Sequence, residues 1–322
     1  MSRRPNLFVI GAAKSGTTSL HDYLDGHPDI YMSPLKEPGY FSPDAPPPRK
    51  HFKYTDSLEH YLTLFRDAKD EKVVGESSTY YLYSRQAPGL IHAFEPNARI
   101  VVMLRNPVDM AFSMHGHRFT HDNESIEDFA AALAADSAPD HGGPERDERI
   151  RREGTYIERA HYAQQLGRWF DTFPSEQILV MVFEDFIADP QAEFGRLLEF
   201  LQVDPTYRPE DFSPHNTAHR LKKGPVTRII RSVPAQWVRH RGLPALIGDQ
   251  RAARIGRRIG EGGLVREDAP KRKLDPQLRE RLEAELSDDI DQLSQMLGRD
   301  MKDTWQRRKV SAAAAAQMEA VS

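Results

Sequence analysis

One segment near the N-terminus constrains the fold of this chain more than any other. Residues 7–10 are apolar and lead into a loop bounded by Gly11 and Gly16, after which Thr17 begins a helical pattern. A strand, a glycine-bounded loop and a helix start, in this order, turn backbone N–H groups and the helix N-terminus toward one point. The segment therefore predicts an anion-binding loop at the carboxyl end of a buried strand.

A second segment follows the same plan further along the chain. Residues 100–104 form another apolar run, which is followed by Arg105 and, eight positions later, by Ser113. In a parallel sheet, ligands bind beyond the carboxyl ends of the strands, so both segments would face one pocket. Together they fit a nucleotide that carries phosphate at both ends of its ribose.

The first loop differs from the triphosphate-binding loop of P-loop kinases. That loop needs a Lys directly after its second Gly, but here Thr17 stands in that place and the cation is Lys14. Arg105 stands where a metal-holding Asp would be expected. These differences argue against a metal-dependent phosphoryl transferase. Two alternatives are kept beside the main interpretation. One is a P-loop nucleotide kinase, despite these differences, and the other is a non-catalytic protein that binds nucleotides or anionic polymers.

The two segments resemble the sulfotransferase family that uses 3′-phosphoadenosine 5′-phosphosulfate (PAPS), particularly its heparan-sulfate-type and bacterial branches. Residues 177–186 and 297–305 also resemble later parts of the family's sequence. The resemblance implies that Arg105 and Ser113 bind the 3′-phosphate. It implies that the 5′-phosphosulfate is gripped by Lys14, Ser15, Gly16, Thr17 and Thr18.

The resemblance also carries expectations for fold and activity. It implies a P-loop-type parallel β-sheet flanked by helices, the PAPS sulfotransferase fold, in a single α/β domain. It implies transfer of a sulfuryl group from PAPS to a hydroxyl or amine, with release of adenosine 3′,5′-bisphosphate (PAP) and no metal requirement. The acceptor implied by the resemblance alone is a carbohydrate or a glycosylated metabolite.

Sulfuryl transfer needs a base for the acceptor's proton and a cation for the departing oxygen. Lys14 is our candidate for the cation. Glu37, which follows the second predicted strand, is our candidate for the base. Heparan-sulfate-type members carry a catalytic Glu in a similar Glu-x-x-x-Phe context, which supports this choice. His117, four residues after Ser113, is the second candidate for the base.

Further cofactor contacts are expected from Tyr162, near the adenine, and from Lys271 and Arg272, where the family has a basic loop over the nucleotide. Ser77 stands where heparan-sulfate-type members have a second Lys, so Lys36 or the run at 271–273 would supply that cation.

Three histidines just past Ser113 raise the question of a metal site. On a helix His117 and His121 share a face while His115 turns away. Zinc needs three or four converging ligands, so we predict no metal site.

Residues 219–273 differ in charge from the rest of the chain. They hold 15 Lys and Arg against four Asp and Glu, in a chain whose net charge is −4. A basic amphipathic pattern within them fits an anionic glycan, a lipid-linked acceptor or a membrane surface. An amphipathic helix on the core with a solvated basic face is the alternative. Nucleic acid is not expected, because no binding module accompanies the charge.

Length and composition complete these expectations. We expect a sulfotransferase domain over 1–310, with 206–265 as its variable basic part and 311–322 as a disordered tail. The chain has no Cys, no apolar run of membrane-spanning length and no signal-peptide pattern, so we expect a cytoplasmic protein. Pro-rich residues 43–51 and residues 135–154 are predicted as loops. Strands are predicted at 6–10, 28–32, 72–76, 99–104 and 177–183. Helices are predicted at 16–26, 85–95, 107–118, 124–135, 155–172, 190–202 and 276–297.

Overall fold

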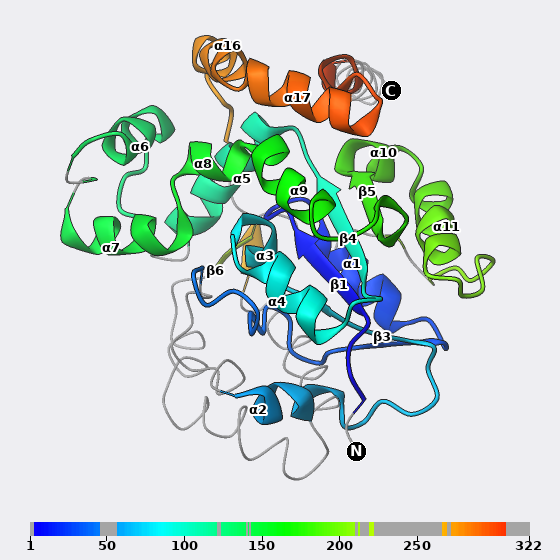
Figure 1. Ribbon diagram of the computed structural model, residues 1–322. Coiled ribbons are helices and arrows are strands. Elements are labelled where there is room, and N and C mark those ends of the chain that lie inside the picture. The colour runs from blue at the N-terminus through cyan, green and yellow to red at the C-terminus, as the bar shows by residue number, and fades with distance from the viewer. Residues whose placement is uncertain are drawn as a thin grey trace.

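A parallel sheet with the order β2-β3-β1-β4-β5 forms the centre of the molecule (Figure 1). The computed structural model describes residues 3–45, 57–120, 124–139, 141, 143–209, 212, 219–221, 266–268 and 272–306. The strands are β1 (Leu7–Gly11), β2 (Ile30–Met32), β3 (Val73–Ser77), β4 (Arg99–Leu104) and β5 (Ile178–Val182). Each predicted strand is present, and the predicted fold class is confirmed. The apolar runs form strands because both faces of a parallel sheet are covered.

Alternation along β1 separates the core into two sides of the sheet. Leu7 and Val9 pack with α1 (Thr17–Asp25) and α11 (Pro190–Phe200). Phe8 and Ile10 pack on the opposite side. This second side is covered by α4 (Ala87–Phe94), α5 (Pro107–Thr120), α9 (Tyr162–Phe170) and α17 (Ser287–Leu297). Successive strand residues point to opposite faces, so one short strand supports both layers.

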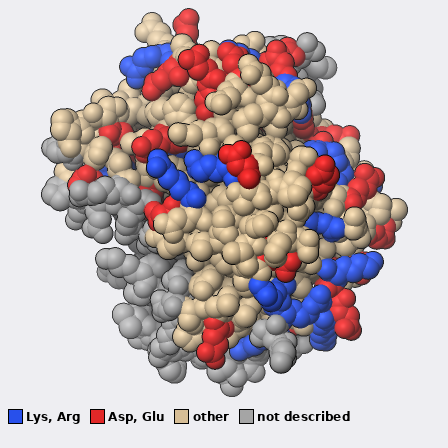
Figure 2. Space-filling model, viewed as in Figure 1, with Lys and Arg blue, Asp and Glu red and all other residues tan. Residues whose placement is uncertain are grey.

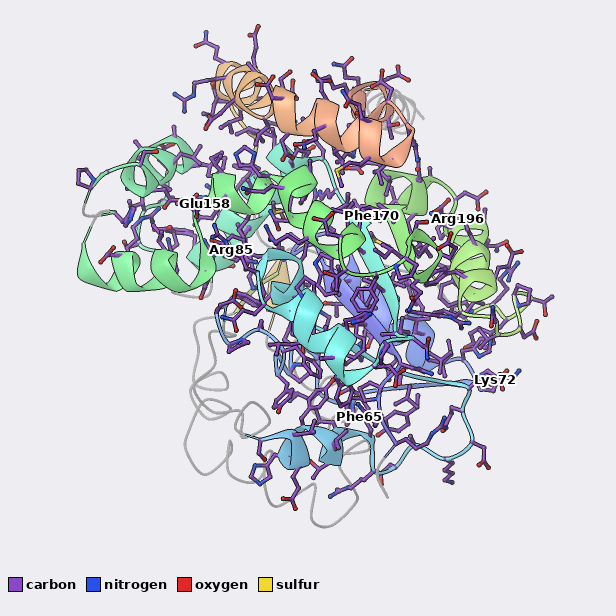
Figure 3. All side chains as sticks on the ribbon, viewed as in Figure 1. Phe65, Lys72, Arg85, Glu158, Phe170 and Arg196 are labelled. Carbon is purple, nitrogen blue, oxygen red and sulfur yellow. The ribbon has the colours of Figure 1, made fainter. Side chains whose placement is uncertain are left out.

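The side chains fill the space between the sheet and its helices (Figure 3). Phe65, in the 3₁₀ turn Thr63–Phe65 after the short helix α2 (Leu58–Leu62), is fully buried. Lys72 and Arg196 extend from the periphery into solvent, and each pairs with a carboxylate. The core therefore consists of the sheet and the helices packed against its two faces.

Two predicted helices are each divided in the structure. The segment predicted at 155–172 forms α8 (Tyr156–Ala160) and α9, because His161 between them has a non-helical ψ of 80°. The segment predicted at 276–297 forms α16 (Pro276–Glu285) and α17, which meet at Leu286. The predicted helix at 124–135 is α6 (Phe129–Asp136), which starts later because the Asp128 side chain caps it. The short helices α2, α3 (Tyr80–Tyr83) and α10 (Phe183–Ala188) were not predicted.

The prediction of a loop at 135–154 is wrong over most of its length, because α7 (Pro144–Glu153) occupies it. The side chain of Arg146 is 7% exposed and bonds the carboxylates of Glu124 and Asp136. Tyr156 donates its hydroxyl to Glu124 and its backbone N–H to Asp136. This helix is held by buried charges rather than an apolar stripe, so hydrophobic periodicity missed it.

Little of the basic stretch 219–273 belongs to the described residues. Strands β6 (His219–Leu221) and β7 (Arg266–Asp268) form an antiparallel pair. The predicted amphipathic segment, most of 206–265 and the predicted tail 311–322 lie outside the described residues. On the face in Figure 2, acidic and basic side chains are interspersed, and acidic ones gather over α16 and α17. Among the described helices, none is long and apolar enough to cross a bilayer.

Candidate active site

The loop between β1 and α1 is shaped to receive an anion. Gly16, with φ +81°, precedes α1, and a Cβ on this residue would lie 3.0 Å from the Phe183 ring. Only glycine meets both conditions without strain. Gly16 stands at the N-cap and has no side chain that could cap α1. The positive end of the dipole of this nine-residue helix therefore faces the loop and favours a bound anion.

Lys14 stands within this loop with a backbone φ of +61°. Across the described residues, its ammonium forms no hydrogen bond or ion pair. Burial, and after it the positive charges of Arg105 and Lys36, together lower the pKa of Lys14 to about 8. Three cations thus converge on one loop, an arrangement that favours a bound anion.

Arg105 connects the two predicted anion motifs directly. Its guanidinium donates a hydrogen bond of 3.0 Å to the backbone carbonyl of Lys14 and lies 5.1 Å above the Phe183 ring. Ser113 is partly exposed on α5, the helix that follows. Both motifs therefore belong to one edge of the sheet, at the carboxyl ends of β1 and β4, as predicted.

A chain of hydrogen bonds links the start of α5 to Glu184 and, through it, to Trp305. The side-chain oxygen of Asn106 accepts from the first amides of α5, at Val108 and Asp109. Glu184 accepts from the Asn106 N–H at 2.9 Å and from the Trp305 indole N–H at 3.1 Å. The helix that carries Ser113 is thus fixed through Glu184 from the C-terminal part of the described chain.

Glu37 lies at the same edge, after β2. Its carboxylate accepts from the Thr79 N–H at 2.7 Å and pairs with the Lys36 ammonium at 2.8 Å. Lys36 also donates to the hydroxyl of Thr17 at 3.3 Å, at the first residue of α1. Lys36 therefore bridges the candidate base and the anion-binding loop.

The other residues of the loop differ in exposure. Ser15 is fully buried, and its hydroxyl faces the Ala13 carbonyl at 3.4 Å. Thr17 is also buried, whereas Thr18 is partly exposed. The Ser15 hydroxyl thus supports the loop itself, and Lys14, Thr18 and the backbone remain for a ligand.

Tyr162 does not have the predicted role beside an adenine. Its side chain is 1% exposed at the start of α9 and packs in the main core. Its hydroxyl is buried near Ser15 and Arg105, and burial raises its pKa, although the interactions with these two residues favour ionisation. A ring without a free face cannot stack on a base, so Tyr162 belongs to the core.

Arg272 packs beside α5, against residues that neighbour Ser113 in the sequence. Its guanidinium lies 5.1 Å above the Phe112 ring, donates to Nδ1 of His115 at 3.0 Å and donates to the Glu127 carbonyl. Its role toward the nucleotide stays a prediction. Lys271 and His121 lie outside the described residues.

The two described histidines of the cluster point different ways. His115 is fully buried against the Ile126 carbonyl at 2.9 Å, and burial lowers its pKa. His117 is exposed on α5. Among the described residues no group of acidic or histidine side chains could hold a metal ion.

The residues that surround Ser77 could hardly be identified from the sequence. Ser77 is fully buried and bonds the Nδ1 of His21 at 2.9 Å. Next to it, the buried carboxylate of Glu76 holds the hydroxyls of Tyr61, Tyr81 and Ser78. These contacts join segments that are far apart in the chain. The only indication in the sequence was the run Glu76–Tyr81, which contains Ser77.

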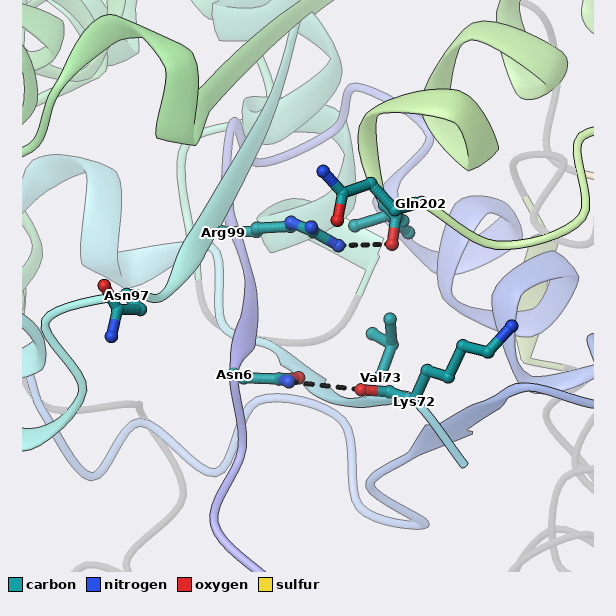
Figure 4. Close-up of a pocket in the computed structure, with 7 residues that line it drawn as sticks. Asn6, Lys72, Val73, Asn97, Arg99 and Gln202 are labelled. Atoms are coloured by element: carbon teal, nitrogen blue, oxygen red, sulfur yellow. Dashed lines mark hydrogen bonds between the residues drawn. The ribbon is translucent and has the colours of Figure 1, made fainter. Parts of the chain in front are cut away.

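A separate cavity of about 250 Å³ lies at the opposite edge of the sheet (Figure 4). Asn6, Lys72 and Arg99 line it at the amino ends of β1, β3 and β4. Arg99 donates to the Leu201 carbonyl, and Asn6 donates to the Lys72 carbonyl at 3.3 Å. This cavity is therefore not part of the site formed by Lys14 and Arg105.

The comparisons with known proteins agree with this geometry. The human heparan sulfate glucosamine 3-O-sulfotransferase 6 is 29% identical over 200 residues, which cover 62% of this chain and 52% of that protein. Human carbohydrate sulfotransferase 15 is 26% identical, covering 73% of this chain and 51% of that protein. The chain thus spans about half the length of these curated relatives.

A solved structure extends the similarity over almost the whole chain. The crystal structure of a sulfotransferase from Alicyclobacillus acidocaldarius superposes with a TM-score of 0.67 at 28% identity. The match covers 94% of this chain and 99% of that one. The family model described as "Sulfotransferase family" matches residues 5–207, which include the entire parallel sheet and both anion motifs. This chain therefore belongs to the sulfotransferase family.

Proposed function

We propose that this protein is a PAPS-dependent sulfotransferase that transfers a sulfuryl group to a hydroxyl or amine and releases PAP, without a metal ion. The observation that carries the proposal is Lys14, an ammonium without a protein partner among the described residues, next to Arg105 and Lys36. Its pKa is depressed by burial and by the positive charges of these two neighbours. The dianionic phosphosulfate end of PAPS would balance the positive charge of the site.

The site residues fit the two anionic ends of PAPS. The uncapped N-terminus of α1 and Lys14 would hold the 5′-phosphosulfate. Arg105, which bonds the Lys14 carbonyl directly after β4, and Ser113, on α5, would hold the 3′-phosphate. When bound, PAPS supplies an activated sulfuryl group on a phosphate leaving group.

Three residues then have distinct chemical tasks. Glu37 accepts the proton of the acceptor hydroxyl or amine as that atom bonds to sulfur. The bond from sulfur to the bridging oxygen breaks, and its electron pair remains on the phosphate of PAP. Lys14 donates a hydrogen bond to that oxygen and stabilises its charge. Lys36, paired with Glu37, holds the base next to the loop.

The acceptor we propose is a carbohydrate or a glycosylated metabolite. This proposal is supported by the similarity to a heparan sulfate glucosamine 3-O-sulfotransferase and to a carbohydrate sulfotransferase. The basic stretch 219–273, with its 15 Lys and Arg, is our proposed surface for an anionic or lipid-linked acceptor. A panel of sulfated and unsulfated oligosaccharides, assayed with labelled PAPS, tests this part.

Calorimetric titration with PAP, AMP and Mg²⁺-ATP tests the donor. We expect tight binding of PAP without metal and much weaker binding of AMP. A preference for Mg²⁺-ATP would instead support a kinase. PAP binding without sulfuryl transfer to any acceptor would support a non-catalytic nucleotide-binding protein.

The Arg105→Ala variant adds a second comparison, since Arg105 also bonds the Lys14 carbonyl. A loss of affinity confined to PAP supports a contact with the 3′-phosphate. An equal loss for PAP and AMP shows that Arg105 acts only by holding the loop.

A further inference from the structure

Glu76 is a buried carboxyl that the proposed reaction does not use. It lies near the end of β3, is fully buried and forms no ion pair with any described residue. One carboxylate oxygen accepts from the hydroxyls of Tyr61 at 3.0 Å and Tyr81 at 2.6 Å. The other accepts from Ser78 at 2.7 Å. Burying a carboxyl costs desolvation free energy even when three hydroxyls bond it, so a carboxyl at this position indicates a functional role.

Two of these hydroxyls connect Glu76 to the segment that carries Glu37. The Ser78 oxygen accepts from the Gly39 N–H at 3.0 Å, and the Tyr81 oxygen accepts from the Phe41 N–H at 3.3 Å. Each hydroxyl donates its own proton to Glu76, which turns a lone pair of the hydroxyl oxygen toward the backbone N–H. Glu76 therefore orients both hydroxyls as acceptors for the backbone.

The segment held in this way, residues 33–41, is called the Glu37 loop. Glu37 has a backbone φ of +61°, which an L-residue keeps only when its surroundings hold it. Its N–H donates to the Ser77 carbonyl at 2.8 Å, and its carboxylate is held by Thr79. Residues 76–81 thus hold the candidate base on both sides, by backbone and by side chain.

We propose that Glu76 is a positioning residue, which orders the Ser78 and Tyr81 hydroxyls so that they hold the Glu37 loop in its reactive geometry. The expected fall in kcat rests on the proposed function, because it requires Glu37 to be the base. The role of Glu76 in holding the Glu37 loop does not depend on that function. A shift of the loop by about 1 Å is enough to lower turnover about 100-fold.

Tyr61 provides a matched control for this proposal. Its hydroxyl reaches the same oxygen of Glu76 as that of Tyr81, and both rings are fully buried. Among the described contacts, however, the Tyr61 hydroxyl accepts no hydrogen bond from the Glu37 loop. Tyr61→Phe and Tyr81→Phe therefore remove the same group from Glu76, and only the second removes the link to Phe41.

The experiment compares Glu76→Gln, Tyr81→Phe, Ser78→Ala and Tyr61→Phe at pH 8, above the pKa of about 7 to which burial raises Glu76 against its hydroxyl donors. Glu76→Gln places an amide N–H₂ against a hydroxyl donor. We expect it to lower kcat by about 10-fold to 100-fold, with the KM for PAPS and the Kd for PAP within about twofold. Tyr81→Phe and Ser78→Ala should lower kcat more than Tyr61→Phe.

Hydrogen–deuterium exchange of the Glu37 loop supplies a measurement that needs no activity. The loop should exchange faster in Glu76→Gln, Tyr81→Phe and Ser78→Ala than in Tyr61→Phe. Equal exchange and equal kcat in Tyr81→Phe and Tyr61→Phe would overturn the proposal. If Glu76→Gln does not fold, the two hydroxyl variants decide the matter. If the wild type transfers no sulfuryl group, the proposed function is wrong. The exchange comparison then still tests whether Glu76 holds the Glu37 loop.

Discussion

The guanidinium of Arg105 donates a 3.0 Å hydrogen bond to the backbone carbonyl of Lys14. This bond joins the end of β4 to the loop that follows β1, two segments that lie 91 positions apart in the chain. The loop is therefore held from the neighbouring strand before any ligand binds. Preorganised donors of this kind need no rearrangement when charge develops in a reaction.

Replacing Glu37 by Gln should remove the base and leave donor binding intact. The variant keeps the shape of the side chain but cannot accept a proton, so turnover should fall by about 10²- to 10⁴-fold. The Kd for PAP should stay within about twofold. A sulfuryl-transfer assay and calorimetry on the same preparation measure both. If His117→Ala abolishes turnover and Glu37→Gln does not, the base is His117.

Binding of PAP should be linked to a proton on Lys14. The pKa of Lys14 is lowered to about 8, first by burial and then by Arg105 and Lys36. Below pH 8 the ammonium is charged and attracts the anion, so affinity should fall as the pH rises through 8. A bound anion raises the pKa of the ammonium again, so binding near pH 9 should take up protons. Calorimetry in buffers of different ionisation enthalpy detects this uptake.

Lys36→Met should move the same affinity loss to higher pH, because it removes one of the charges that lower the pKa of Lys14. Lys72→Met is the matched control, since Lys72 pairs with Asp29 on the surface at 3.1 Å. It should leave the pH dependence unchanged. An unchanged profile in Lys36→Met would show that the titrating group is not Lys14.

Removing the charge of Arg146 should strongly destabilise the fold. Its buried guanidinium bonds the carboxylates of Glu124 and Asp136 and the Ala132 carbonyl. Arg146→Met leaves two buried carboxylates without this partner, and we expect a loss of about 3–5 kcal/mol in the free energy of unfolding. Urea denaturation measures the loss.

Arg196→Met is the control for the Arg146 variant. Arg196 forms an exposed pair with Glu193 at 2.7 Å, and such pairs contribute about 0–1 kcal/mol. Equal stability losses in the two variants would contradict the buried network around Arg146.

Glu124 should give the fold an acid-sensitive component. Burial alone would raise its pKa, but the Ile126 N–H, the Tyr156 hydroxyl and the charges of Arg149 and Arg146 lower it from 4.5 to about 2. A carboxyl with a depressed pKa in the folded state stabilises that state above its unfolded pKa. This contribution should be complete above pH 4.5 and lost as the pH falls toward 2.

The measurement for Glu124 is the difference in unfolding free energy between wild type and Glu124→Gln across this range. The difference should shrink as the pH falls from 4.5 toward 2, since protonation makes the two side chains alike. A difference that stays constant would show that Glu124 does not titrate in this window.

Local sequence was sufficient for the parallel sheet and for both anion motifs. Residues 7–20 and 100–113 contain a strand, a turn and a helix start within a few positions, and these signals depend on neighbouring residues. The five strands fall close to their predicted positions. Lys14, Arg105 and Glu37 share one sheet edge because parallel strands end there.

Other features depended on contacts between distant segments. Helix α7 was predicted as a loop because its buried side chain Arg146 is held by Glu124, Asp136 and the Ala132 carbonyl, which belong to other segments. Tyr162 was predicted at the adenine because burial cannot be inferred from an aromatic residue at helical spacing.

The sequence by itself determined where the strands follow one another along the chain and which charged residues belong to the site, since both follow from short local patterns. Only the tertiary structure decided that Arg105 bonds the Lys14 carbonyl, that Lys36 joins Glu37 to Thr17, and that Glu76 lies behind the Glu37 loop. These contacts join segments that lie tens of residues apart in the chain. They form cooperatively with the folded sheet, so local sequence patterns do not reveal them.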